Sequence, residues 1–177
     1  SILVEKFYND TYLVDQNACS SPHIIIWKGK KSANKIAQKK FWDNIYALVV
    51  RKYNLENSAA VEKYTLLCKK INFLNNNCEL VKYENFIYIL VLKKLVNNLD
   101  ELRGKWGLFY EYETNNLDKI SKFLNKKFQT MTYFGLDKSV CKKIVVDNLT
   151  DGIDRIVPIG QALDINLNWD GFDLNKS

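Results

Sequence analysis

The sequence has no apolar run near the ~20 residues that a membrane-spanning helix needs. Its longest candidate, Phe86 to Leu92, is stopped by Lys93 and Lys94. Only 7 Gly and 2 Pro interrupt 177 residues, and 47% of the residues are apolar, a composition that excludes fibrous and disordered chains. We therefore expect one compact cytoplasmic domain over residues 1–177, with no membrane span.

Paired cysteines are also missing. The four cysteines stand far apart with no CxxC pair and follow no signal-peptide pattern, at Cys19, Cys68, Cys78 and Cys141. This spacing predicts free thiols in a reducing compartment. With a single histidine, His23, the sequence offers only one loose Cys–His pair, so we expect no zinc site.

The chain has fewer acidic than basic residues, which gives a formal net charge of +6. A basic surface concentrates polyanions, so a phosphate-bearing or nucleic-acid partner is one interpretation. The lysines are spread along the chain, however, and dispersed charge is typical of a solvated surface. No nucleic-acid motif is present, and we expect no nucleic-acid partner.

Two helices are predicted early in the chain. One spans Ser32 to Tyr53, and the other begins near Asn57 and ends at the polar run Asn75 to Asn77. Apolar residues at three- and four-residue steps should face inward from both helices: Ala37, Phe41, Ile45, Leu48 and Val49 from the first, and Val61, Leu66, Leu67 and Ile71 from the second.

Short segments rich in β-branched and aromatic residues predict strands after these helices. The expected order is strand 78–83, strand 86–92, strand 107–113, helix 116–125 capped by Asn116, strand 128–134, helix 136–146 and a strand-rich tail from Asp154. Strands separated by helices are typical of parallel sheets. We therefore expect an α/β fold, a three-layer sandwich with a mostly parallel sheet.

The segment richest in chemical possibilities is Asp15-Gln16-Asn17-Ala18-Cys19-Ser20-Ser21-Pro22-His23, which precedes the apolar strand Ile24 to Trp27. Small and polar neighbours leave a thiol open to substrate, and the thiolate is a strong nucleophile. A buried structural cysteine is the alternative, because most free cysteines serve as small apolar residues.

This segment resembles the active-site segment of LuxC-type acyl-CoA reductases and is more distantly similar to the cysteine loop of aldehyde dehydrogenases. Two later segments agree in order. Residues 126–135, KKFQTMTYFG, resemble the strand that follows the family's last large helix. Residues 152–164, GIDRIVPIGQALD, together with Trp169-Asp170-Gly171, resemble its carboxy-terminal signature.

The resemblance implies the fold of the aldehyde dehydrogenase catalytic domain. It also implies that Cys19 attacks an acyl-CoA or acyl-protein thioester, and that NADPH reduces the resulting acyl-enzyme to a fatty aldehyde. An acyl-protein synthetase is an implied partner. A homo-oligomer of the full-length enzyme, formed through the carboxy-terminal tail, is also expected.

The segment Asp100-Glu101-Leu102-Arg103-Gly104-Lys105-Trp106-Gly107 matches the position of the acidic segment that binds the nicotinamide ribose in aldehyde dehydrogenases. On this match Glu101 accepts hydrogen bonds from ribose hydroxyls. Glu111, in the following strand, is a rival, and an exposed carboxylate without a ligand is a further alternative. His23 is a candidate base for the thiol by its ordinary pKa, but it enters an apolar strand, which favours a structural role.

One family feature is missing, because no GxGxxG turn is present. We therefore expect this chain to be the carboxy-terminal, thiol-bearing part of a larger enzyme, with the amino-terminal cofactor-binding part absent and no turnover on its own. Two other functions remain open. One is an aldehyde dehydrogenase that works in the oxidative direction, and the other is a non-catalytic basic binding domain.

Overall fold

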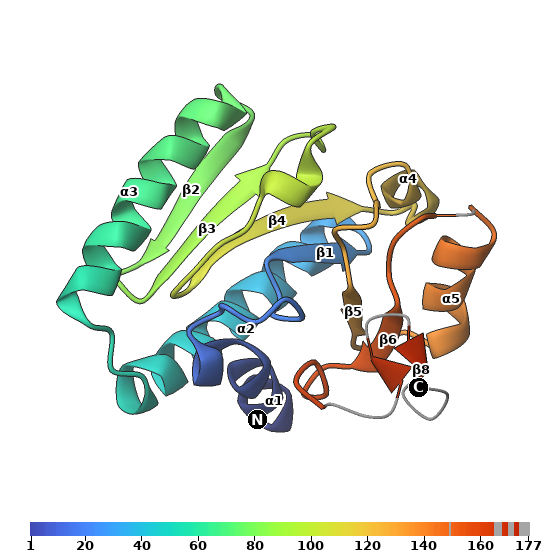
Figure 1. The fold of residues 1–177 in the computed structure, drawn as a ribbon. Helices are drawn as coiled ribbons and strands as arrows, with labels where there is room; N and C mark the ends of the chain where they lie inside the picture. The colour runs from blue at the N-terminus through green and yellow to red at the C-terminus, as the bar shows by residue number, and fades with distance from the viewer. Residues whose placement is uncertain (149, 165–167, 170–171, 174–177) are drawn as a thin grey trace.

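The computed structural model describes residues 1–148, 150–164, 168–169 and 172–173 (Figure 1). The elements along the chain are α1 (Ile2–Thr11), η1 (Tyr12–Val14), β1 (Ile24–Lys28), α2 (Lys31–Lys52), α3 (Asn57–Leu74), β2 (Cys78–Tyr83), β3 (Ile87–Leu92), η2 (Leu99–Glu101), β4 (Leu108–Thr114), α4 (Asp118–Ser121), β5 (Thr130–Tyr133), α5 (Lys138–Val146), β6 (Arg155–Pro158), β7 (Asn168–Trp169) and β8 (Phe172–Asp173).

The main sheet has four strands in the order β1-β4-β3-β2. β1 and β3 both run parallel to β4, whereas β2 pairs antiparallel with β3 as a hairpin. β5 and β6 form a separate parallel pair. The prediction of a mixed α/β fold with a mostly parallel sheet is therefore confirmed, and β2 is antiparallel because the turn between β2 and β3 is too short for a crossover.

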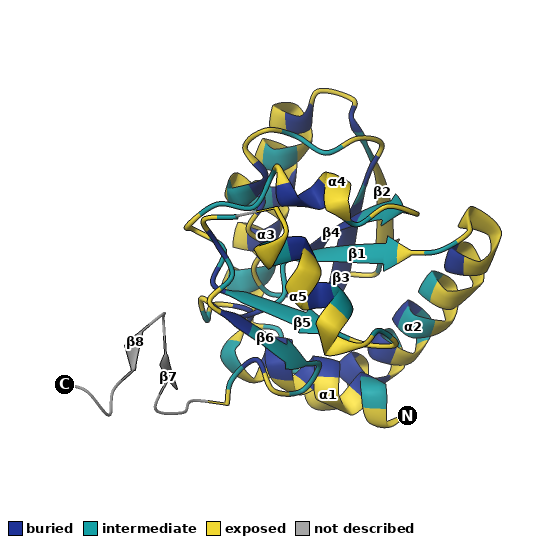
Figure 2. Ribbon diagram, turned by 90° about the vertical axis from the view of Figure 1, so that its right-hand side faces the viewer, coloured by how far each residue is buried: buried dark blue, intermediate teal, exposed yellow. Residues whose placement is uncertain are grey.

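Helices lie against both faces of this sheet, and β3 and β4 are buried between them (Figure 2). One apolar cluster joins α1 and α2 to one face, with buried members that include Phe7, Trp42, Ile45, Ile89 and Phe109. A second cluster joins α3 and the β3–β4 connection to the other face, with buried members that include Leu67, Leu74, Leu90, Leu99 and Leu102. Alternate residues of β3 therefore enter different clusters, as the two-residue period of a strand requires.

Periodicity located the long elements well, and the observed bounds of α2, α3, β2, β3 and β4 lie close to the predicted ones. The predicted helix 116–125 is wrong, because α4 spans only Asp118–Ser121. Asn116 does accept a hydrogen bond from the Asp118 N–H (2.9 Å). At the other end, the Asn125 side chain binds the Lys127 N–H and Asp100 in place of a helical turn.

Some of the predicted inward-facing positions are also wrong. Ala37 is exposed, and the side chains of Val61 and Ile71 are 67% and 37% exposed. The arc of each helix that contacts the sheet is offset from the apolar arc, so that polar Asn34 and Lys63 are buried instead. Lys63 donates to three backbone carbonyls at the starts of β3 and β4, and those bonds let its ammonium lie inside the protein.

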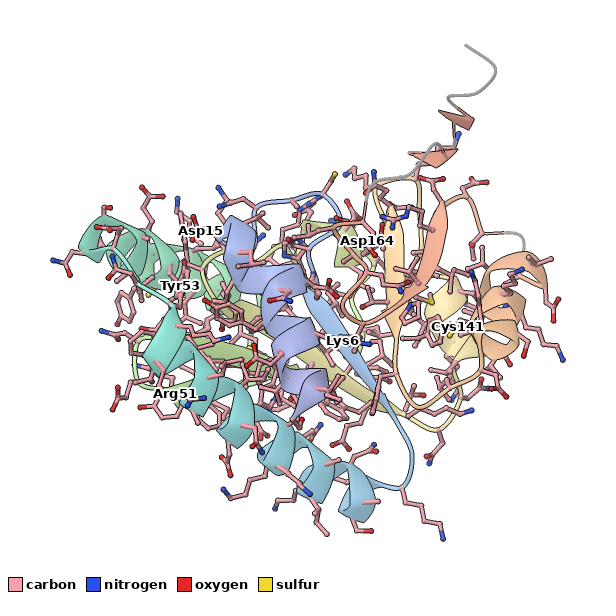
Figure 3. All side chains as sticks on the ribbon, turned by 90° about the horizontal axis from the view of Figure 1, so that it is seen from below. Lys6, Asp15, Arg51, Tyr53, Cys141 and Asp164 are labelled. Atoms are coloured by element: carbon pink, nitrogen blue, oxygen red, sulfur yellow. The ribbon has the colours of Figure 1, made fainter. Side chains whose placement is uncertain are left out.

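Helix α1 is tied to the carboxy-terminal signature by a buried carboxylate. Asp10 accepts hydrogen bonds from the N–H groups of Gly160 (2.6 Å) and Ala162 (3.0 Å). Arg155 holds the same turn, because its guanidinium donates to the carbonyls of Gln161, Ala162 and Asp164. Lys6 of α1 and Asp164 of this turn are labelled in Figure 3. In the described residues the signature therefore has a structural role that joins the two ends of the fold.

Replacing Asp10 with Ala should lower the free energy of unfolding by about 2–3 kcal/mol, because two buried N–H groups lose their acceptor. The measurement is urea unfolding at pH 7. Glu5→Ala is the control on the same helix, since Glu5 makes only an exposed ion pair with Lys52, and it should change the value by less than about 0.5 kcal/mol. Equal losses in the two variants would contradict this assignment.

Candidate functional site

The candidate nucleophile, Cys19, lies exposed on the loop that connects η1 to β1. The next two residues, Ser20 and Ser21, are buried, so the loop is anchored immediately beside the thiol. His23 then leads into β1, whose residues pair with β4 from Ile24 onward. Cys19 is therefore placed at the amino end of the parallel strands.

Gln16 fixes the shape of this loop. Its buried side-chain amide donates to the carbonyls of Pro22 (2.8 Å) and Leu108 (3.0 Å), and its Oε1 accepts from the Gly107 N–H (3.0 Å). One side chain thus closes the cysteine loop on itself and joins it to the start of β4. We call this arrangement the Gln16 clasp.

The clasp joins two turns of unusual backbone conformation. Asp15 and Gln16 have φ values of 53° and 59°, and opposite them Trp106 and Gly107 have φ values of 53° and 88°. The Trp106 N–H donates to the Asp15 carbonyl (3.1 Å). The Tyr53 hydroxyl, at the carboxy end of α2, donates a hydrogen bond to the side chain of Asp15 (2.6 Å), and both residues are labelled in Figure 3. Consecutive left-handed residues persist only where surrounding contacts determine them, and such strain clusters at functional sites.

Two backbone donors remain unused beside the thiol. Neither the N–H of Cys19 nor that of Ser20 donates to any residue that the structure describes, whereas the N–H of Ser21 donates to Ala18 (3.0 Å). Fixed backbone donors next to a nucleophile are the arrangement that stabilises an oxyanion. The loop therefore carries an exposed thiol whose own N–H and that of the next residue have no acceptor among the described residues.

His23 has a structural role in this site. Its Nδ1 accepts a hydrogen bond from the Gly104 N–H (3.2 Å), and the Arg103 Nη2 lies 3.4 Å from its Nε2. Burial, together with the nearby Arg103 charge, lowers the pKa of His23 to about 4. In the neutral ring Nδ1 is the acceptor nitrogen, and it already accepts from the Gly104 N–H. His23 is therefore not free to take the proton of Cys19.

Glu101 lies at the end of η2 with its side chain exposed. Its Oε1 accepts a hydrogen bond from the Asn98 amide (3.3 Å), and its backbone carbonyl accepts from Lys70 and from the Arg103 N–H. The Arg103 and Gly104 contacts with His23 bring this segment to the base of the cysteine loop. Glu101 itself is bonded to Asn98 and to Lys70 of α3, and no described contact joins its carboxylate to the Cys19 loop.

Glu111 lies in a different environment. It is 3% exposed, and its Oε1 accepts hydrogen bonds from the indole N–H groups of Trp27 and Trp42, both at 2.6 Å. Burial raises the pKa of Glu111 to about 7, against the lowering effect of the two indole donors. The sequence analysis did not predict that Glu111 is buried and joins two tryptophans. A glutamate inside the apolar strand sequence LFYEYET is the feature that could have indicated a buried acid.

Two hollows lie elsewhere on the molecule. One of about 380 Å³ is lined by residues 121, 122, 124, 125, 148, 150 and 151, and one of about 320 Å³ by residues 75–77, 93 and 94. Neither lining includes Cys19 or Glu101. In the described part of the chain no three or more His, Cys, Asp or Glu side chains gather as metal ligands, and no described helix has the length and apolarity needed to cross a bilayer.

The remaining residues of the resemblance divide into two groups. Arg155 is bonded within the carboxy-terminal turn. Asp170 and Gly171 lie outside the described residues, and Trp169 is described only as part of β7. Comparison with known proteins adds no identification, because no family model and no curated protein matches this chain.

Removing the clasp with Gln16→Ala should lower the free energy of unfolding by about 3 kcal/mol, because the buried Leu108 carbonyl and Gly107 N–H and the partly buried Pro22 carbonyl lose their partner. Thermal and urea unfolding measure this loss. Asn17→Ala is the matched control, since its side chain is exposed on the same loop, and it should leave stability unchanged. If Gln16→Ala were as stable as the control, the clasp would not hold the loop.

The raised pKa of Glu111 predicts a stability contribution that is present below pH ~4.5 and disappears as the pH rises through about 7. Its size is up to about 3 kcal/mol. His23 has an opposite effect in this window, because its lowered pKa makes stability rise with pH. We therefore compare wild type with Glu111→Gln by urea unfolding from pH 4.5 to 8, since His23 contributes equally to both. The free energy of unfolding of the wild type, relative to that of Glu111→Gln, should fall as the pH rises from 4.5 through about 7. A difference between the two proteins that does not change with pH would refute a proton held on Glu111.

Proposed function

We propose that this chain is the thiol-bearing part of an enzyme that reduces an acyl thioester to an aldehyde, with Cys19 as the covalent nucleophile. One observation carries the proposal. An exposed thiol lies on a loop fixed by the Gln16 clasp, beside two backbone N–H groups that have no acceptor among the described residues. The resemblance of residues 15–23 to LuxC-type acyl-CoA reductases supplies the reaction class.

The first step follows from ordinary thioester chemistry. The Cys19 thiolate attacks the acyl carbonyl, the carbonyl electron pair moves to oxygen, and the N–H groups of Cys19 and Ser20 donate to that oxyanion. The oxyanion then collapses, a new thioester forms at Cys19, and the thiolate of coenzyme A or of an acyl-protein leaves. Exchange of one thioester for another costs little free energy, so the barrier depends mainly on stabilising the oxyanion. His23 takes no part as a base, so the thiol proton leaves to water.

NADPH is the proposed cofactor. The exposed carboxylate of Glu101 fits a ribose, because among the described residues one of its oxygens has a single donor, the amide of Asn98 at 3.3 Å, and the other has none. The nicotinamide supplies two electrons when it is bound. Glu111 fits this role less well, because it is buried and its Oε1 already accepts two indole donors.

We also propose that the fold is a three-layer sandwich. Helices on both faces of a mostly parallel sheet support a three-layer sandwich like the aldehyde dehydrogenase catalytic domain. Four free cysteines support a cytoplasmic, reducing location. An acyl-protein synthetase remains the proposed partner, and the oxidative aldehyde dehydrogenase reaction is the rival activity.

The decisive experiment is intact-protein and peptide mass spectrometry after exposure to acyl-CoA thioesters of short, medium and long chain. We expect one acyl adduct on the peptide that contains Cys19. Cys19→Ala should abolish it, and Cys68→Ala should retain it, because Cys68 is also an exposed thiol but lies on the surface of α3.

Adducts in equal yield at both cysteines would show only general thiol reactivity and would contradict the proposal. For the direction of reaction, the full-length enzyme that contains this chain is incubated with acyl-CoA and NADPH and separately with aldehyde and NAD, because this chain is expected to have no turnover on its own. Faster cofactor consumption in the second mixture would favour the oxidative enzyme.

A further inference from the structure

Helix α3 carries an exposed apolar strip along one flank. Val61, Tyr64, Cys68 and Ile71 recur at steps of three and four residues, and the first two side chains are 67% and 55% exposed. This spacing places all four on one side of a helix, as in the seam between two packed helices. The single chain therefore leaves exposed a strip whose pattern is typical of burial.

The flank that contains this strip has no charged residue. Its members from end to end are Asn57, Val61, Tyr64, Thr65, Cys68, Ile71 and Asn72. Charged residues make up 26% of the chain, and on α3 they lie on the other flank or under the helix. Loss of charge from an exposed surface is the compositional mark of the centre of a protein interface.

The strip adjoins an open sheet edge. Lys70 donates to the Glu101 carbonyl, so η2 lies against the opposite flank of α3, and the strip faces the side of β2 (Figure 1). Lys63 of α3 and Lys82 of β2 both lie over the Tyr88 ring, at 4.8 and 5.0 Å, which places helix and strand side by side.

β2 is the end strand of the sheet and pairs only with β3 among the described residues. Its four central residues, Glu79 to Lys82, are all exposed, with Leu80 and Val81 each 41% exposed. An open edge with exposed apolar residues presents unpaired backbone groups to any strand that approaches it. A partner at this side therefore gains backbone hydrogen bonds as well as apolar contact.

We propose that a second copy of this chain covers this surface, with the two β2 strands antiparallel across a twofold axis and the two α3 strips packed against each other. An antiparallel α3 pair centred near Leu66 places Val61 opposite Ile71 of the second copy and Tyr64 opposite Cys68 of the second copy. Every apolar residue of the strip then meets an apolar residue. A twofold contact needs such a self-complementary surface, and an uncharged strip lets two copies of a +6 chain meet without like charges in contact.

The available area also suits a second copy. The 18 residues of α3 extend over ~27 Å and the six of β2 over ~20 Å. A strip of that length, one helix and one strand wide, covers on the order of 600 Å² per copy, close to the ~800 Å² of a standard stable interface. This surface is distinct from the carboxy-terminal tail, where the sequence predicted the oligomer contact.

The test is the mass of the purified protein in solution, measured by light scattering after size exclusion over a range of concentrations. We expect a dimer for the wild type and a monomer for Val61→Glu, with the dissociation constant raised by at least about tenfold because each copy brings a charge into the apolar seam. Val146→Glu is the matched control, since Val146 is a 64% exposed helical valine on α5, and it should remain a dimer. Circular dichroism confirms that both variants are folded.

The orientation is tested separately. In Tyr64→Cys the new thiol lies opposite Cys68 of the second copy, so mild oxidation should give a covalent dimer on a non-reducing gel. Tyr64→Cys with Cys68→Ala should give much less. A monomeric wild type, a dimer that survives Val61→Glu, or crosslinking that does not depend on Cys68 would each overturn the proposal.

Discussion

The Gln16 clasp is the constraint on which the candidate site depends. A single buried amide satisfies two carbonyls and one N–H that belong to different segments, and those segments include Gln16 and Trp106, whose residue types seldom adopt the left-handed conformation. The clasp also joins the cysteine loop to the start of a central strand. The thiol is therefore exposed on a loop whose backbone is held by hydrogen bonds from a buried side chain, as positioning for a reaction requires.

A second feature of the molecule is that burial favours the uncharged form of three of its ionisable groups. Burial shifts the pKa of Glu111 to about 7, that of Lys63 to about 7 and that of His23 to about 4, in each case toward the uncharged form. Each group also has hydrogen-bond partners. Glu111 accepts from two indoles, Lys63 donates to three carbonyls, and His23 accepts from one backbone N–H.

The sequence predicted the long elements because apolar periodicity acts over many residues, and the period of α3 was clear. It did not predict which arc of that helix meets the sheet, since Val61 and Ile71 follow the same rule as Leu67 and yet are exposed. The site was predictable only in part. Composition marked the Cys19 loop, but the contacts of Gln16 with Leu108 join residues 92 positions apart, and no local pattern encodes such a pair.

The bond between Asp10 and the turn at residues 160–162 has a consequence for biosynthesis. These partners are 150 and 152 residues apart, so the carboxylate of α1 meets its donors only after almost all of the described chain has been translated. Until then α1 lacks one of its two attachments, while the hairpin and the parallel strands between them have already left the ribosome. Closure of the fold is thus a late event, and a nascent chain stalled before this turn should expose α1 to proteases and chaperones.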